Sequence, residues 1–409
     1  MTPESVSPTV RLSRNLAHLA SDAHGSLDRE VERRRVAGAL VADLAREEPA
    51  IDPPRGSLEA ALKTLREGHG PTSAAGGLEL RAAAARYLSL LSGGRPVNAD
   101  HVVVSAGARH ACFTAFFSLF EHGDHVLLPK PGWPAFEGLV RLARASPVAI
   151  QGDLEWSLKV SAQDLGARSD ARTAGLVLST PVNPTGAVYT RSELKTLFEW
   201  ALERNLWIVC DETYRRVHYG SGPAPSALDL PDELLQRAVV VTGLDASHGL
   251  AGWQIAVALA PPEVSRAMGR VQEHAMGAVP WPAQRGAAAA LSSDRADHDL
   301  AQWLDTLREH RDAVVAYFRR ELPGVEFIEP LGAYYFFFRV DGFFSGSITS
   351  ARSFCERLVE EHGVALAHGG TFGDERWVRL NYAASRRDIE RGLEGLATFV
   401  RSLTGGDVS

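Results

Sequence analysis

Five clusters of polar residues lie close to the ends of short apolar runs in the middle of the chain. They occupy residues 105–109, 129–134, 179–186, 211–214 and 249–254. In a sheet of parallel strands covered by helices, ligands bind at the carboxyl ends of the strands. Asp211 and Tyr214, which follow one apolar run directly, are therefore expected to line a pocket, where a carboxyl group and a phenol can exchange protons with a ligand.

The segments that position these clusters alternate between strand-like and helical patterns. This alternation predicts an α/β fold with a mostly parallel central sheet covered by helices on both faces. The strand-like runs occupy residues 101–105, 125–129, 174–179, 206–212, 238–243 and 255–260. The helical segments between them occupy residues 108–120, 135–143 and 192–204.

The two ends of the chain show other patterns. Helical periodicity predicts early helices over residues 28–44, 58–66 and 77–91. A long helix over 301–322 precedes strand-like runs at 325–330 and 333–340 near the other end. We therefore expect an N-terminal segment (1–55), a large domain (56–300) and a smaller C-terminal α+β domain (301–409).

The composition excludes several classes of protein. The 43 basic and 50 acidic residues give a formal net charge of −7, which provides no electrostatic reason to expect nucleic-acid or membrane binding. The three cysteines are far apart and the histidines are scattered, so neither a disulfide framework nor a metal site is expected. No signal peptide or transmembrane run is apparent, and we expect a cytoplasmic protein.

Lysine is rare in this chain, and its distribution limits the possible mechanisms. The lysines are Lys63, Lys130, Lys159 and Lys195. Because no lysine follows Lys195, any mechanism that needs a lysine from the C-terminal half is excluded.

Taken together, the motifs resemble those of the class I/II aminotransferases, fold-type-I enzymes that depend on pyridoxal phosphate (PLP). The sequences NPTG at 183–186, DETY at 211–214 and GLAGW at 249–253 carry this resemblance, which extends over roughly residues 40–400. The resemblance implies a large domain with a mostly parallel sheet, a smaller C-terminal α+β domain and a homodimer. It also implies an amino-acid-like small-molecule substrate.

Four residues match family positions that hold the cofactor ring. Trp133 matches the aromatic residue that stacks on the ring, and Asn183 and Tyr214 match the residues that contact its phenolic oxygen. Asp211 matches the carboxylate that pairs with the pyridine nitrogen, an arrangement that makes the ring an electron sink.

Further matches concern the two anionic groups that the family binds. Arg379, in the sequence WVRLNYA, matches the arginine that grips a substrate α-carboxylate through a bidentate pair. Gly107, Ala108 and Arg109 match the residues that open a helix where the cofactor phosphate lies.

The sequence departs from the family pattern at several positions together. Ala246 occupies the position of the lysine that forms the Schiff base with PLP, and Gly243 replaces a serine. Gln254 stands where an arginine neutralises the phosphate, and His69 stands where a tyrosine reaches the phosphate of the partner subunit. Glu47 replaces a glycine near the substrate carboxylate. These changes predict the loss of the Schiff base and weaker binding of the phosphate.

Our leading hypothesis from the sequence is a PLP-independent enzyme of specialised metabolism, with no cofactor expected. Proton transfer, elimination or cyclisation of an amino-acid-like or carboxylate substrate would then rest on acid–base groups. The candidate catalytic residues are Glu47, His69, Tyr214, Asp211 and His248. The candidate substrate-binding residues are Arg379, Trp133 and Asn183. PLP binding without a Schiff-base lysine stays possible under this hypothesis.

Two other functions stay open. The chain could be a conventional PLP-dependent aminotransferase that carries an engineered lysine-to-alanine substitution at position 246, or a non-catalytic protein that binds a ligand or a partner subunit.

The roles of two single residues are ambiguous as well. Glu47 could be a solvated loop residue, or a carboxylate near Arg379 that binds an amine or acts as a base. Asp245 could be a general base or a turn residue.

Overall fold

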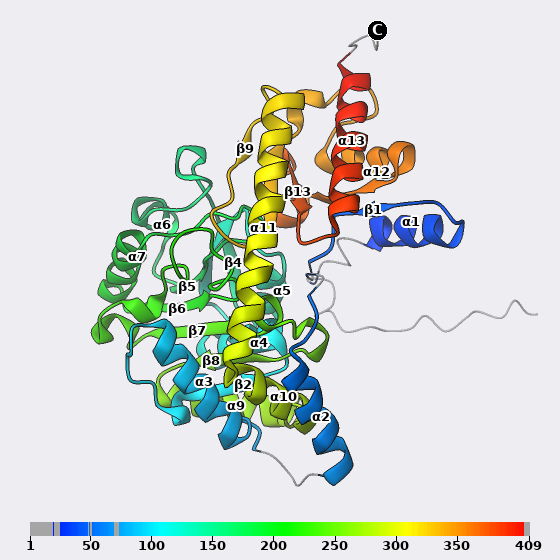
Figure 1. The fold of residues 1–409 in the computed structure, drawn as a ribbon. Helices are drawn as coiled ribbons and strands as arrows, with labels where there is room; N and C mark the ends of the chain where they lie inside the picture. Colours follow the sequence, from blue (N-terminus) through cyan, green and yellow to red (C-terminus); the bar gives the residue numbers. More distant parts are fainter. Residues whose placement is uncertain (1–18, 20–24, 48, 50, 69–72, 405–409) are drawn as a thin grey trace, which may run out of the picture.

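A seven-stranded sheet forms the centre of the molecule (Figure 1). The computed structural model describes residues 19, 25–47, 49, 51–68 and 73–404. The strand order is β2-β8-β7-β6-β5-β3-β4, and only β8 runs antiparallel to its neighbours. The strands are β2 (Val102–Ser105), β3 (His125–Lys130), β4 (Ser146–Gln151), β5 (Thr173–Ser179), β6 (Trp207–Asp211), β7 (Ala238–Gly243) and β8 (Ala256–Leu259). The predicted α/β fold with a mostly parallel sheet is confirmed.

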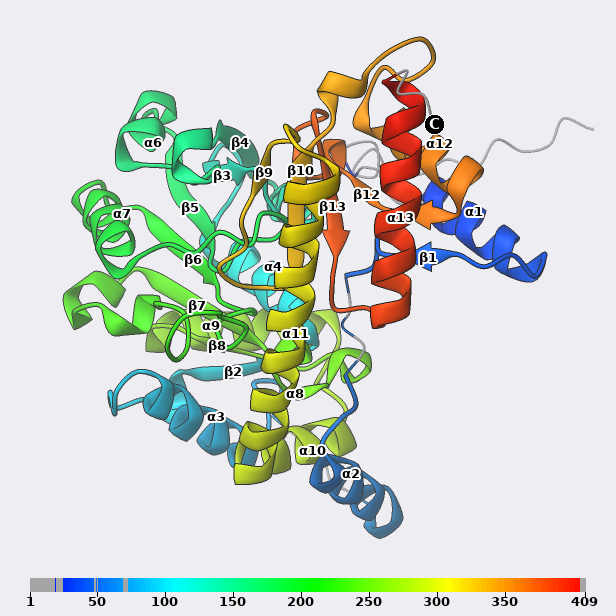
Figure 2. The ribbon, with the colours of Figure 1, turned by 45° about the horizontal axis from the view of Figure 1, so that its top comes forward.

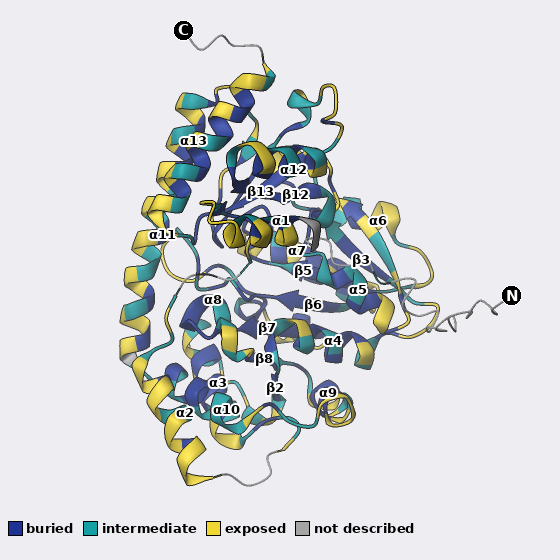
Figure 3. Ribbon diagram, turned by 90° about the vertical axis from the view of Figure 1, so that its right-hand side faces the viewer, coloured by how far each residue is buried: buried dark blue, intermediate teal, exposed yellow. Residues whose placement is uncertain are grey.

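Helices cover both faces of this sheet, because successive side chains of a strand point to opposite faces. Val177 and Val209 pack in one core with α4 (Gly107–Leu119), α5 (Ala135–Leu142) and α9 (Pro262–Ala275). Leu178 and Ile208 pack in another core with α6 (Ala162–Arg168) and α7 (Arg191–Glu203). A third core includes α3 (Leu78–Leu91) and α10 (Trp281–Leu291). The strands therefore appear dark blue in Figure 3, buried on both faces.

The C-terminal part contains a separate four-stranded antiparallel sheet with the order β12-β13-β10-β9. These strands are β9 (Phe327–Ile328), β10 (Tyr335–Arg339), β12 (Ala367–His368) and β13 (Trp377–Asn381). Helices α12 (Ala351–His362) and α13 (Arg386–Leu403) pack against it. The long helix α11 (Asp294–Glu321) runs beside both the central sheet and this part (Figures 1 and 2).

The N-terminal segment joins the C-terminal part through a short strand. Helix α1 (Gly25–Val36) is followed by β1 (Ala42–Asp43), which pairs in parallel with β11 (Val364–Ala365). The predicted helix over 28–44 is therefore wrong in its second half. Gly38 adopts a φ of +76°, a left-handed conformation that ends helices, and the chain then extends to pair with β11. Helix α2 (Arg55–Glu67) follows.

None of the helices in the described ranges is long and apolar enough to cross a membrane. The same ranges contain no group of three or more histidine, cysteine or acidic residues that could hold a metal ion.

Candidate active site

A pocket of about 210 Å³ lies at the carboxyl ends of the central strands. This volume is below the roughly 300–1,000 Å³ of pockets for drug-sized ligands, so it suits one small molecule. The lining side chains come from the ends of β5 and β6, the start of α4, the short helix α8 (Asp245–His248), the loop before β8 and the segment just after β1. The polar clusters predicted at the strand ends do meet in one place.

One side of the pocket, which we call the ring end, consists of Trp133, Asn183, Asp211 and Tyr214. Asp211 is the last residue of β6 and is only 6% exposed. Its Oδ1 accepts hydrogen bonds from the backbone N–H of Thr213 at 3.0 Å and from the Thr213 hydroxyl at 2.6 Å. Burial raises the pKa of this carboxyl group to about 6, although the Thr213 hydrogen bonds oppose the shift.

The other ring-end residues come from loops that follow the strands. Asn183 is buried, and its Oδ1 accepts a hydrogen bond from Arg379 at 3.0 Å. Tyr214 contacts the hydroxyl of Tyr335 at 2.9 Å, and burial holds the pKa of its phenol well above the usual range. Tyr214 therefore stays protonated near neutral pH. Trp133 is half-buried, and the guanidinium of Arg109 lies 4.8 Å from the centroid of its ring.

The first turn of α4 forms a second side of the pocket, lined by Gly107, Ala108 and Arg109. The residue that precedes this helix is Ala106, which provides no side-chain cap, so the first backbone N–H groups are open to an anion. Gly107 has a φ of +78°, and a Cβ atom there would lie 2.9 Å from Oε1 of Gln254. Glycine therefore lets the backbone approach closely at this point.

The third side of the pocket, which we call the α8 end, lies around α8. It contains three positions that differ from the family pattern, namely Gly243, Ala246 and Gln254. Asp245 and Gln254 line the pocket, whereas Ala246 is fully buried and Gly243 ends β7. A Cβ atom at position 243 would lie 2.5 Å from Oδ1 of Asp245, so glycine makes room for this carboxylate. Gln254 donates from Nε2 to the backbone oxygen of Ala251 at 2.8 Å.

Arg379 and Glu47 form an ion pair next to the ring end. The Arg379 side chain is fully buried, and its guanidinium lies 3.4 Å from Oε1 of Glu47. Oε2 of Glu47 accepts a hydrogen bond from Nε1 of Trp133, also at 3.4 Å. Glu47 lines the pocket, whereas Arg379 is not one of the lining residues.

One of the two predicted catalytic histidines, His248, does not line the pocket. His248 is buried on α8, where its Nδ1 lies 2.7 Å from the Ser247 hydroxyl and its ring packs edge-on against Tyr87. Burial lowers the pKa of His248 to about 3, so its ring is neutral near pH 7. His69 lies outside the described residues.

Some pocket residues escaped the sequence analysis. Tyr334 lines the pocket, and the hydroxyls of Tyr334 and Tyr335 each donate to the backbone oxygen of Glu47 at 3.1 Å. The apolar run at 333–340 reads as a core strand. The available signal was the pair of tyrosines directly before three phenylalanines, since a buried tyrosine hydroxyl usually needs a hydrogen-bond partner.

The pocket fits the ring and the phosphate of PLP. A buried carboxyl group, an amide, a phenol and an indole meet at the ring end, and the uncapped start of α4 offers N–H groups beside Arg109. The covalent anchor is the missing part. Among the residues that the structure describes, the pocket lining includes no lysine.

The relatives of this chain are aminotransferases. A sequence model of the family described as "Aminotransferase class I and II" matches residues 42–396. The aspartate aminotransferase of Bacillus subtilis (strain 168) is 30% identical over 400 residues, which cover 96% of this chain and 99% of that protein. The aspartate aminotransferase of Thermotoga maritima is 30% identical over 392 residues, covering 96% of this chain and 100% of that protein.

Solved structures agree with the sequence comparison. The crystal structure of the aspartate aminotransferase from Thermotoga maritima matches with a TM-score of 0.88 and 29% identity, covering 95% of this chain and 100% of that chain. The aspartate aminotransferase from Rhizobium meliloti matches with a TM-score of 0.89 and 25% identity, covering 96% and 99%.

These relatives overturn the hypothesis of a PLP-independent enzyme that needs no cofactor. Similarity over the full length to proteins named aspartate aminotransferase points to a PLP-dependent transaminase instead. The hypothesis gave the missing lysine too much weight, because the ring-end side chains and the start of α4 still converge on one pocket. The alternative of a PLP-dependent aminotransferase is better supported. The chain belongs to the class I and II aminotransferases.

Proposed function

We propose that this protein is a PLP-dependent aminotransferase that holds its cofactor without a lysine. The observation that carries this proposal is the meeting of Asp211, Asn183, Tyr214 and Trp133 in one pocket at the start of α4. Bound PLP supplies an electron sink for the bonds at the amino-bearing carbon of the substrate.

Each ring-end residue has a distinct task in this proposal. The Asp211 carboxyl group, which is buried next to Thr213, pairs with the ring nitrogen and keeps it protonated. The Trp133 indole forms a wall for the ring, and the amide of Asn183 and the phenol of Tyr214 orient the ring through hydrogen bonds. The N–H groups of the first turn of α4 and the Arg109 guanidinium hold the phosphate.

The proton that a lysine would move needs another carrier in this chain. Asp245 lines the pocket and precedes Ala246 on α8. Its carboxylate is a suitable general base for a proton at the amino-bearing carbon. Gly243 supports this role, because a larger residue would collide with the Asp245 carboxylate.

A PLP titration of the purified protein, followed by absorbance and calorimetry, tests the binding step. We expect saturable binding that borohydride reduction does not make covalent, since no lysine lines the described pocket. Absence of any PLP binding would refute the proposal. Transfer of an amino group to a keto acid, followed by mass spectrometry, then tests the activity.

The Ala246→Lys variant provides a matched comparison. Position 246 follows the pocket-lining Asp245, so we expect borohydride to fix PLP on the peptide that contains residue 246. Mass spectrometry of the digested protein identifies this peptide. Fixation on Lys130 or another lysine in place of position 246 would contradict the placement of α8.

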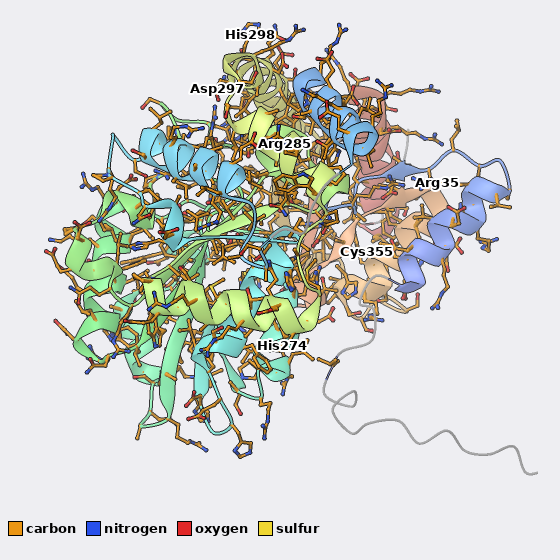
Figure 4. The ribbon with its side chains drawn as sticks, turned by 90° about the horizontal axis from the view of Figure 1, so that it is seen from below. Arg35, His274, Arg285, Asp297, His298 and Cys355 are labelled. Atoms are coloured by element: carbon orange, nitrogen blue, oxygen red, sulfur yellow. The ribbon has the colours of Figure 1, made fainter. Side chains whose placement is uncertain are left out.

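We also propose that the protein acts as a homodimer. The outer face of α2 exposes Leu58, Leu62 and Leu65 at 42%, 51% and 62%, and this spacing aligns them on one side of the helix. Figure 3 shows the helix largely exposed, and Figure 4 shows Arg285 of α10 and the start of α11 on the same side of the molecule. Light scattering of the wild-type chain and of Leu62→Glu tests this proposal, since a single-chain mass for the wild type would refute it.

A further inference from the structure

The partners of Arg379 within the chain already use most of its hydrogen-bonding capacity. Its two terminal nitrogens donate to Asn183 Oδ1 at 3.0 Å, to the backbone oxygen of Ala45 at 2.7 Å and to Glu47 Oε1 at 3.4 Å. The aromatic rings of Tyr335 and Phe372 lie 4.4 and 4.8 Å from the guanidinium carbon. A ligand in the pocket therefore does not meet a free arginine.

Glu47 lines the pocket and contacts Arg379, whereas the fully buried Arg379 is not one of the lining residues. One carboxylate oxygen faces the guanidinium, and the other accepts the hydrogen bond from Trp133 Nε1. The backbone oxygen of Glu47 accepts hydrogen bonds from the phenols of Tyr334 and Tyr335, which fix this part of the chain. The Glu47 side chain thus holds a carboxylate on the arginine without any substrate.

The charges that line the pocket also disfavour an anionic substrate. Among the described residues, the ionisable side chains that line the pocket, apart from tyrosine, are Glu47, Asp211, Asp245 and Arg109. Arg109 lies beside Trp133 at the start of α4, where the phosphate of PLP is expected. With Arg109 assigned to the phosphate and Asp211 to the ring nitrogen, the described lining offers no further cationic side chain to a substrate carboxylate, and the carboxylates of Glu47 and Asp245 repel one.

We propose that Glu47 is a specificity-determining residue that takes the place of a substrate carboxylate on Arg379, so that the amino donor is an amine without an α-carboxylate. The proposal deepens the proposed function and rests on it, because it names the class of substrate that the same pocket accepts. The ammonium group of such an amine enters a pocket lined by carboxylates.

Three ligands that share one carbon skeleton separate the possibilities. L-leucine carries both groups, 3-methylbutylamine lacks the carboxylate, and 4-methylpentanoate lacks the amine. We expect the PLP-loaded wild-type protein to bind the amine at least about 10-fold more tightly than leucine, and the carboxylic acid not at all. Calorimetry and ligand-detected NMR measure the three affinities.

Substitution of Glu47 should reverse this preference. In Glu47→Gln the charge is lost while the shape is kept, and in Glu47→Gly the position in front of Arg379 is opened. Both variants should gain affinity for leucine and 4-methylpentanoate and lose affinity for the amine, each by about 10-fold. Glu263→Gln, an exposed change on α9, is the matched control and should leave all three affinities unchanged.

Two results would overturn the proposal. One is a wild-type protein that binds leucine as tightly as the amine, and the other is a preference that neither Glu47 variant alters. Melting temperatures of the variants, with and without 4-methylpentanoate, show whether they fold and whether an added carboxylate restores the lost partner of Arg379. The affinities are also measured without PLP, so that failure of PLP binding is distinguished from failure of the Glu47 assignment.

Discussion

The ring end and the α8 end of the pocket differ in how the fold supports them. Asp211 ends the central strand β6 and Asn183 lies in the loop after β5, and the two residues are 6% and 3% exposed. Gln254, at the α8 end, is exposed in a loop with a left-handed backbone. Each ring-end side chain has a buried partner, whereas at the α8 end Asp245 and Gln254 hydrogen-bond within their own segments, to the backbone of Ala246 and Ala251. The comparison teaches that a substitution at the α8 end can be accommodated by a neighbouring residue, as Gly243 makes room for the carboxylate of Asp245.

The largest expected effect concerns PLP binding at the ring end. Asp211→Ala removes the buried carboxyl group that faces the ring nitrogen, and hydrogen bonds to charged groups contribute roughly 1.5–3 kcal/mol. We expect the PLP dissociation constant to rise by roughly 10- to 100-fold in an absorbance titration. Ala246→Gly, at the α8 end, should change it much less. Equal effects of the two substitutions would remove the distinction between the two ends.

Acid should destabilise the α8 end through His248. Burial lowers the pKa of this histidine to about 3 in the folded protein. As the pH falls below about 6.5, His248 therefore binds a proton in the unfolded chain before it does so in the folded protein. The stability from neutral His248 is complete above that pH and should fall by roughly 2 to 3 kcal/mol between pH 7 and pH 4.5. Urea unfolding of the wild type and of His248→Phe measures this loss of unfolding free energy. A variant whose unfolding free energy depends on pH as steeply as that of the wild type would contradict the prediction.

Asp211 should act in the opposite direction at the ring end. The pKa of its carboxyl group is raised to about 6, so its ionisation costs the folded state stability as the pH rises through that value. Relative to Asp211→Asn, the cofactor-free wild type should lose about 2 kcal/mol between pH 4.5 and pH 7. Urea unfolding at both pH values tests the sign, and a gain of stability over this range would contradict the burial of the carboxyl group.

The smallest expected effect is a gain at the α8 end. Gln254→Arg places a guanidinium beside Gly107 and the open start of α4, which should tighten PLP binding by about 10-fold through a charge-assisted hydrogen bond. Inorganic phosphate should compete more strongly in the variant. Gln302→Arg, on the exposed surface of α11, controls for the added charge. Weaker binding in Gln254→Arg would place the phosphate elsewhere.

Much of the fold could be predicted because the central strands are buried on both faces and therefore read as continuous apolar runs. The pocket positions of Asp211 and Asn183 were accessible for the same reason, since polar residues at the ends of such runs stand out. The pairing of Glu47 with Arg379 joins residues 332 positions apart, and no local pattern encodes it, so the alternative of a Glu47 carboxylate near Arg379 came only from the family resemblance. The helix predicted over 28–44 ends early because a distant strand competes for the same backbone.

The pairing of β1 with β11 has a consequence for how the protein is made. Residues 42–47 hydrogen-bond to residues 363–365 and 379–381, so these contacts form only after nearly the whole described chain has been synthesised. Contacts of such separation form slowly, because a very long loop must close before they contribute. The central sheet can assemble earlier from neighbouring segments. Glu47 and Arg379 therefore meet late in biosynthesis, and the charge of the pocket is among the last features that the folding chain acquires.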